Sequence, residues 1–326
     1  MSHRDEIPDD LRSDPDVPED VRYDPDLAVH EPMQVPTAPL RPSLGRSPLL
    51  VIPLVVLALS LLIVLLFGWL ARETRTSADY VGTIRQMRPE AWQTAFELSR
   101  RLADENPHQR GPLLVPDLIA AFRDADGRDP RLRRYLALSL AHLKDPRTRD
   151  ALLGALRDDD LETRLYALWG LGGLGDATTA PDLIPVLQSD DADLRKAAAY
   201  ALGATGGAAA AAALRTALND SVADVAWNAA LALARLGDPS GVQVIARMLD
   251  RNYLENVSRI DADGVRRPMS EVQVEEALVG ALRGAALLGE HAPTGRMRAL
   301  RRGDSSLRVR QAAREALEKL RGEGTR

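Results

Sequence analysis

The sequence predicts an all-α protein: a right-handed α-solenoid of about six helix pairs, preceded by one transmembrane helix and a disordered acidic tail. Three observations predict this class. Hydrophobic residues make up 45% of the 326 residues but aromatic residues only 4%, so the apolar positions are mostly aliphatic residues and alanine, which favour helices. A long uncharged run lies near the N-terminus. Beyond it, apolar positions recur at a fixed interval, which is typical of repeat proteins.

Residues 1–47 are predicted to be a disordered, acidic and proline-rich tail. They contain 5 arginines against 11 aspartates and glutamates, and 8 of the 21 prolines. Such a composition cannot bury enough apolar surface to offset the entropy of ordering. Two consecutive decapeptides, 8–17 and 18–27, match closely, which indicates either a docking motif present twice or a recent duplication of low-complexity sequence. Under the first hypothesis, the partner-binding residues are Leu11, Arg12, Val21 and Arg22.

The segment 48–70 is predicted to be a transmembrane helix. From Leu49 to Leu70 there are 22 residues without a charged side chain. A helix of this length spans a hydrocarbon core of roughly 30 Å. We therefore expect a single-pass protein of a membrane, with a bacterial inner membrane as the expected location. The orientation stays open, because the arginine count slightly favours a cytoplasmic repeat region while many bacterial proteins of this layout export theirs.

Residues 89–326 are predicted to form the solenoid, after a linker at 71–88. The aligned starts of four units, each 31 residues after the last, are Leu132, Thr163, Leu194 and Val225. Apolar residues recur 4, 8 and 11 positions after most of these starts, which is the spacing of one helix face. Small residues occupy the seventh position, where a neighbouring helix is expected to approach closely: Ser139, Gly170, Ala201 and Ala232. The turn that follows contains Asp in most units, as expected at the start of a second helix.

The array is interrupted once, by an insertion at about 251–271. The fifth unit begins 52 rather than 31 residues after the fourth. Insertions in solenoids usually form loops and often contribute to the binding face. The apolar residues of this insertion are therefore candidate partner contacts: Tyr253, Ile260, Val265 and Met269.

Arginines form a column one position after the aligned starts. The column comprises Arg133, Arg164 and Arg195, and aspartates precede it at Asp129, Asp160 and Asp191. The favoured interpretation is a ladder of ion pairs between units, and the alternative is an anion-binding stripe. The column ends in the later units, and 42 basic against 47 acidic residues give a net charge of −5. We therefore do not expect nucleic-acid binding, which needs clustered cations along the phosphates.

The stretch 191–203, which reads Asp-Ala-Asp-Leu-Arg-Lys-Ala-Ala-Ala-Tyr-Ala-Leu-Gly, resembles the short HEAT-like repeat named after phycobilisome lyases. The resemblance covers roughly 89–326 and implies a HEAT-like solenoid. It implies little about activity, because the family includes bilin lyases, an iron-dependent hydroxylase and many scaffolds. The hydroxylase uses paired His-Glu motifs on its repeats, whereas His30-Glu31 in the tail is the one His-Glu of this sequence.

Together these observations favour a non-catalytic, membrane-anchored HEAT-repeat scaffold or accessory subunit that mediates protein–protein interaction. We expect no catalytic, cofactor-binding or metal-binding residues, because the chain has no cysteine and its histidines do not follow the repeat. The expected partners are proteins, in a membrane complex, and the lipid bilayer around 49–70. Neither nucleic acid nor a small-molecule substrate is expected. The alternative is an enzyme resembling a bilin or chromophore lyase, or an isomerase, that uses the solenoid groove.

Overall fold

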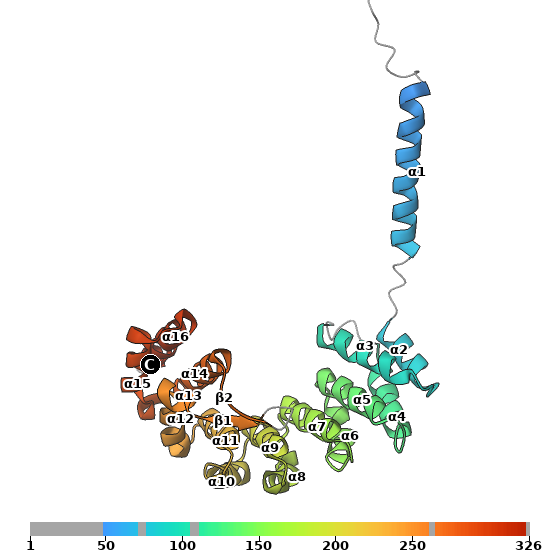
Figure 1. Cartoon of the computed structure of the whole chain (residues 1–326). Coiled ribbons are helices and arrows are strands. Elements are labelled where there is room, and N and C mark those ends of the chain that lie inside the picture. The colour runs from blue at the N-terminus through green and yellow to red at the C-terminus, as the bar shows by residue number, and fades with distance from the viewer. Residues whose placement is uncertain (1–47, 71–75, 105–110, 261–264, 324–326) are drawn as a thin grey trace, which may run out of the picture. The chain divides into compact units, whose positions relative to one another are not determined.

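The computed structural model describes residues 48–70, 76–104, 111–260 and 265–323. The predicted disordered tail therefore lies outside the described residues. The chain divides into two compact units, Met1–Glu73 and Thr74–Arg326. The first unit contains helix α1 (Pro48–Leu70), whose described side chains run from 52 to 66 and are all exposed (Figure 1). In the part of the chain that is described, no helix is both long and apolar enough to cross a membrane.

The second unit begins with a short helix in a segment predicted to be a linker. Helix α2 (Ser77–Ile84) starts at a capping box, in which Thr76 and Asp79 each accept a hydrogen bond from the other's backbone N–H. Val81 and Ile84 are buried, and α2 packs against the two helices that follow it. The prediction of a linker over 71–88 was wrong for this part, because two apolar residues one turn apart suffice to dock a capped helix.

Helix pairs form the rest of the second unit, which is a helical repeat solenoid as predicted. The first helices of the pairs are α3 (Ala91–Asp104), α5 (Pro130–Leu143), α7 (Leu161–Leu174), α9 (Ala192–Thr205), α11 (Ala223–Arg235) and α14 (Glu271–Ala285). The second helices are α4 (Leu114–Asp124), α6 (Arg149–Ala155), α8 (Ala180–Leu183), α10 (Ala208–Ala217), α12 (Val242–Met248) and α15 (Thr294–Gly303). The last described helix, α16 (Leu307–Glu323), packs against α14 and α15.

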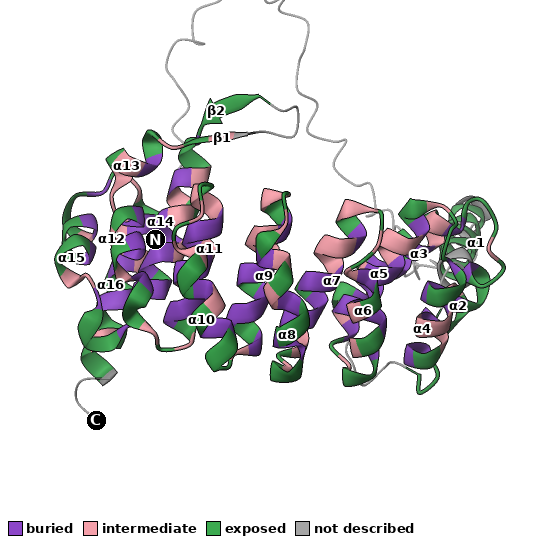
Figure 2. Ribbon diagram, turned by 90° about the horizontal axis from the view of Figure 1, so that it is seen from below, coloured by how far each residue is buried: buried purple, intermediate pink, exposed green. Residues whose placement is uncertain are grey.

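The first helices stack in sequence order and form one layer of the solenoid (Figures 1 and 2). Neighbouring first helices share far more contacts than neighbouring second helices do. The buried side chains form two hydrophobic clusters, one from α2 to α11 and one from α11 to α16. Because α11 contributes to both clusters, the core continues through the whole unit. This arrangement places one face of every first helix on the surface.

Small residues set the spacing between the first helices. The three close contacts join Gly170 to Ala141, Gly172 to Ala201 and Gly203 to Ala232. A Cβ atom added at Gly203 would lie 2.4 Å from the Cβ of Ala232, closer than real Cβ atoms approach. The prediction that the small column marks close helix approach is confirmed at these contacts. The contacts also show a second small column, which the first one meets on the neighbouring helix.

The insertion is more ordered than a loop. It begins with helix α13 (Arg251–Glu255) and continues as an antiparallel hairpin of β1 (Ser258–Ile260) and β2 (Arg266–Pro268). The hairpin pairs Ser258 with Pro268 and Ile260 with Arg266. The expectation of a loop was therefore incomplete, because alternating residues on both sides of 261–264 support strand pairing.

Substituting Gly203 with alanine should destabilise the solenoid. The added methyl group would overpack the α9–α11 contact, and overpacking of this kind costs about 1–3 kcal/mol. Gly173→Ala is the matched control, because a Cβ there meets nothing within 4 Å and α7 should gain up to about 1 kcal/mol of helix propensity. Thermal unfolding of the full chain in detergent measures both. Equal melting temperatures for the two variants would contradict the close packing.

Candidate functional site

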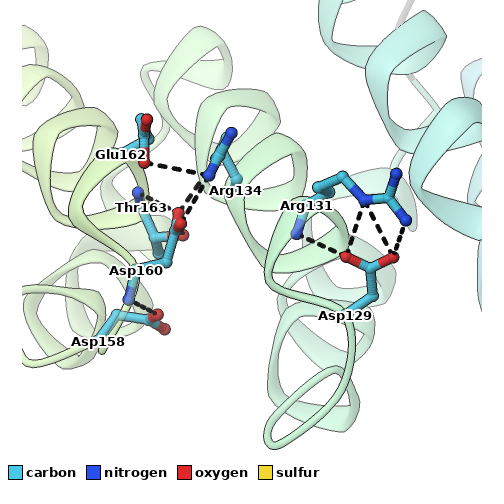
Figure 3. A network of polar contacts seen from close by, with 7 residues as sticks. All are labelled: Asp129, Arg131, Arg134, Asp158, Asp160, Glu162 and Thr163. Carbon is cyan, nitrogen blue, oxygen red and sulfur yellow. Dashed lines mark hydrogen bonds and ion pairs between the residues drawn. The ribbon is translucent and has the colours of Figure 1, made fainter.

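Arg134 ties the start of α7 to the neighbouring helix α5. Its guanidinium lies 2.7 Å from Asp160 and 3.0 Å from Glu162 (Figure 3). Asp160 also accepts a hydrogen bond from the backbone N–H of Thr163 and so caps α7. Burial raises the pKa of Asp160, but the hydrogen bonds from Arg134 and Thr163 outweigh burial and hold that pKa below its usual value. One carboxylate thus serves as helix cap and as inter-helix link.

The arginine column pairs with aspartates that lie 25 residues further along the chain. Arg133 lies 2.6 Å from Asp158, and Arg195 lies 2.8 Å from Asp220. Exposure of these four side chains ranges from 8% to 14%. The prediction of an ion-pair ladder is thus confirmed at two rungs, whereas the aspartates before the column mainly cap helices.

Six aromatic residues occupy the surface of the first-helix layer. We call them the aromatic face: Trp92, Phe96, Tyr135, Tyr166, Trp169 and Tyr200. Tyr135 and Tyr166 hold equivalent positions in successive units, and so do Trp169 and Tyr200. Tyr166 and Trp169 are one helical turn apart and therefore lie on the same side of α7. The face consequently extends over α3, α5, α7 and α9.

Ring contacts hold the aromatic face together across helix boundaries. The Tyr135 ring of α5 lies between two rings of α3, with centroids 6.4 Å from Trp92 and 5.0 Å from Phe96. Between α5 and α7, the His142 ring stands edge-on to Trp169 at 5.0 Å. These contacts restrict the side chains to few rotamers, so little entropy remains to be lost when a ligand binds.

The rings remain accessible although they touch one another. Phe96, Trp169 and Tyr200 are 38%, 37% and 36% exposed. Large aromatic side chains usually bury most of their surface, so an ordered set at this exposure marks a contact surface. Burial, together with the neighbouring Tyr135, raises the pKa of Tyr166, so its hydroxyl stays neutral and can donate a hydrogen bond.

Arginines lie over several of these rings. Arg131 stacks on Trp92 at 4.4 Å and pairs with Asp129 (Figure 3), Arg100 lies 5.9 Å from the Phe96 ring, and Arg235 lies 5.1 Å from the Tyr200 ring. Among the described residues, neither Arg100 nor Arg235 forms an ion pair. The aromatic face therefore offers flat apolar area together with cations that can accept acidic groups of a ligand.

The structure separates the predicted contact residues of the insertion from one another. Val265 is 46% exposed, whereas Met269 is 7% exposed and belongs to the core. Met269 was therefore a wrong choice as a surface contact, because the residue that closes the hairpin docks it onto α14. Tyr253 is half-buried against Trp227, and the side chain of Ile260 is not described. The predicted tail contacts Leu11, Arg12, Val21 and Arg22 lie outside the described residues.

Arginines fix the insertion to the solenoid. Arg251 of α13 lies 2.8 Å from Asp304, whose side chain is 1% exposed, and 2.9 Å from Glu271. The hydrogen bond from Asp304 is the main cause that raises the pKa of Arg251. Arg259 of β1 pairs with Asp224 of α11. These bonds make the hairpin a fixed part of the second unit.

The sequence contained a signal for the aromatic face that its analysis missed. The face holds six of the 13 aromatic residues, two pairs of them at the repeat interval. A search for recurring aromatic residues would have found Tyr135 with Tyr166 and Trp169 with Tyr200. Within the described ranges, no group of three His, Cys, Asp or Glu residues is placed to hold a metal ion.

Replacing Asp220 with asparagine should destabilise the protein at neutral pH. The hydrogen bond from Arg195 holds the pKa of Asp220 below its usual value, and losing a hydrogen bond between charged groups costs about 1–3 kcal/mol. Because the folded-state pKa is lowered, the stabilisation is present above the unfolded-state pKa of about 4 and is lost as the pH falls through the folded-state pKa.

Melting temperatures of the full chain at pH 7 and at pH 3 measure this effect. The difference between Asp220→Asn and the unmodified protein should be large at pH 7 and shrink at pH 3. Asp159→Asn, at an exposed loop position, is the control and should change little. A difference for Asp220→Asn that is the same at both pH values would contradict the ion pair.

Comparisons with known proteins agree with the repeat architecture. Residues 115–203 and 180–259 match HEAT repeats. No curated protein matches the chain. A solved complex of CpcE and CpcF of phycocyanin lyase from a Nostoc species is 22% identical, covering 76% of this chain and 95% of that chain with a TM-score of 0.48.

Two further structures show similar arrangements at lower scores. Human deoxyhypusine hydroxylase is 16% identical over 74% of this chain and 84% of its own, with a TM-score of 0.33. A computationally designed armadillo repeat protein for modular peptide recognition is 16% identical over 74% of this chain and 98% of its own, with a TM-score of 0.39. At these scores the likenesses say nothing about what this chain binds. The match over residues 115–259 shows that this part of the chain consists of HEAT-like repeats.

Proposed function

We propose that this chain is a membrane-anchored, non-catalytic scaffold whose aromatic face binds an extended segment of a protein partner. The observation that carries the proposal is the exposed row of rings on four consecutive first helices. An extended polypeptide that crosses these helices meets a ring on each, because the rings follow the repeat. Its apolar side chains would lie between rings, and its acidic groups would face Arg100 and Arg235.

The energetic features of the aromatic face match those of protein interfaces. Tryptophan, tyrosine and arginine are the residues most often found as binding hot spots. Trp169 and Tyr200 provide this kind of area at the middle of the face, where neighbouring contacts exclude water. The ion pairs of Arg131 and Arg134 keep the surrounding side chains in place. A ready-made surface of this kind supports binding without chemistry.

The proposed membrane anchor is α1. The 22 uncharged residues from 49 to 70 support it, and so does the exposure of every described side chain between 52 and 66. An aliphatic helix without a cover in water is costly, since burial of apolar surface contributes about 25 cal/mol per Å². A bilayer supplies that cover over the length of the helix. The scaffold would then hold its partner at the membrane surface.

Photo-crosslinking tests the aromatic face. A photoreactive phenylalanine analogue is placed at Tyr200 in the full chain, which is expressed in its native host and irradiated in membranes. We expect a covalent adduct with one defined protein. The matched control carries the analogue at Leu307, which is 75% exposed and lies outside the face. Equal adducts at both positions, or none at Tyr200, would contradict binding at this face.

Trp169→Ala combined with Tyr200→Ala should weaken capture of that crosslinked protein by at least tenfold, because hot-spot truncations cost about 2 kcal/mol or more. Val272→Ala, at a residue that is 62% exposed on α14, is the control and should leave capture unchanged. Binding is measured by co-purification with quantification of the partner. Circular dichroism confirms that both variants remain helical.

Alkaline carbonate extraction tests the anchor. The full chain should remain in the membrane pellet, because an inserted apolar helix is not released by high pH. A variant without residues 48–70 should move to the supernatant while keeping the helical content of its second unit. Release of the full chain by carbonate would contradict membrane insertion.

A further inference from the structure

The loop after each second helix repeats one hydrogen-bonding pattern. Asp158 accepts a hydrogen bond from the backbone N–H of Asp160, two residues on, at 3.0 Å (Figure 3). Asp220 accepts one in the same way from Val222 at 2.8 Å. In both loops a second carboxylate oxygen of the aspartate binds the column arginine. Each aspartate thus holds its loop with one oxygen and its arginine with the other.

The loop between these two keeps the pattern but lacks the carboxylate. Ser189 holds the equivalent position, and its hydroxyl accepts the hydrogen bond from the N–H of Asp191 at 3.2 Å. The single oxygen of serine carries no charge and is already used by the loop. The column arginine of this unit is Arg164. Its rung of the ladder therefore has a guanidinium and no aspartate.

Arg164 has no replacement partner. Its Nε atom is buried and accepts no contact, and within the described residues the guanidinium takes part in no hydrogen bond or ion pair. Arg149 and Arg259 also have an unpaired buried Nε, but both pair with aspartates through other contacts. A partly buried charge without a partner is costly, because it gives up water and gains nothing in return.

We propose that Arg164, beside the Ser189 loop, is a binding site for a carboxylate of an acidic polypeptide, supplied by the partner. The carboxylate would occupy the place that the side chains of Asp158 and Asp220 hold in the neighbouring rungs. Arginine suits this ligand because its planar guanidinium can bind both carboxylate oxygens. Arg164 and Tyr166 are two residues apart on α7 and so point to opposite sides of the helix. The site is thus separate from the aromatic face.

Supplying the missing carboxylate from within tests the geometry. Ser189→Asp in the full chain should raise the melting temperature in detergent by about 2–4 °C, as a new ion pair of about 1 kcal/mol would in a domain of this size. The increase should vanish in the double variant with Arg164→Gln. Ser221→Asp is the matched control, because it adds the same charge to the next loop, where Asp220 already pairs with Arg195. No increase for Ser189→Asp would overturn the proposal.

Peptide binding tests the ligand. The probe is a fluorescent peptide of ten glutamates, measured by anisotropy against the full chain in detergent at low salt, with a ten-glutamine peptide as reference. Arg164→Gln and Ser189→Asp should each weaken binding of the glutamate peptide at least fivefold. The controls are Arg157→Gln and Ser221→Asp, which change the same charges on the same edge and should weaken it less than twofold. Equal losses in variants and controls would show only general charge attraction and overturn the proposal.

Two further variants identify the source of the carboxylate. Asp190→Asn should leave peptide binding unchanged, whereas a clear increase would show that the neighbouring Asp190 occupies Arg164 and would overturn the proposal. Deleting residues 1–47 should also leave binding unchanged, and an increase would mean that the chain's own acidic tail, and no partner, fills the site. Tyr200→Ala should not affect this assay, so its outcome is independent of the aromatic face.

Discussion

The close approach of neighbouring first helices is the constraint on which the rest of the structure depends. At Gly203 and Ala232 there is no room for one further methyl group, and the same is true at Gly170 and Ala141. Because these contacts recur at the same position in successive units, each helix is placed on the next in the same register. The register brings equivalent side chains into rows. The aromatic face is one such row, and the arginine ladder is another.

Charged side chains secure the loops that helix packing leaves free. The aspartates at the loops cap helices, hold turns and bind arginines of the neighbouring helix, often with different oxygens of one carboxylate. Asp160 does the first and the third, and Asp220 the second and the third. A solenoid has contacts only between neighbours, so each such bond strengthens one interface. Where one unit departs from this pattern, as at Ser189, the departure marks a place where another molecule can complete it.

The repeat interval alone predicts the helix pairs, the small-residue contacts and the position of the insertion, since each depends on local spacing along the chain. The interval does not predict features that depend on single side chains meeting in space. Helix α2 was missed because only Val81 and Ile84 bury it. The ladder partners were missed because Arg133 and Asp158 are brought together by a whole helix pair. The aromatic face was within reach of the sequence, because Trp169 and Tyr200 obey the interval, but the search had followed aliphatic residues.

The central claim is that the aromatic face is covered by a partner in the cell, and oxidative footprinting tests it most directly. Hydroxyl radicals label exposed aromatic side chains, so labelling of the chain in native membranes is compared with labelling of the purified chain in detergent. The account predicts that Trp169 and Tyr200 are protected in membranes, while Leu307 and Val272 are labelled equally in both. Equal labelling of Trp169 and Tyr200 in the two samples would contradict the claim.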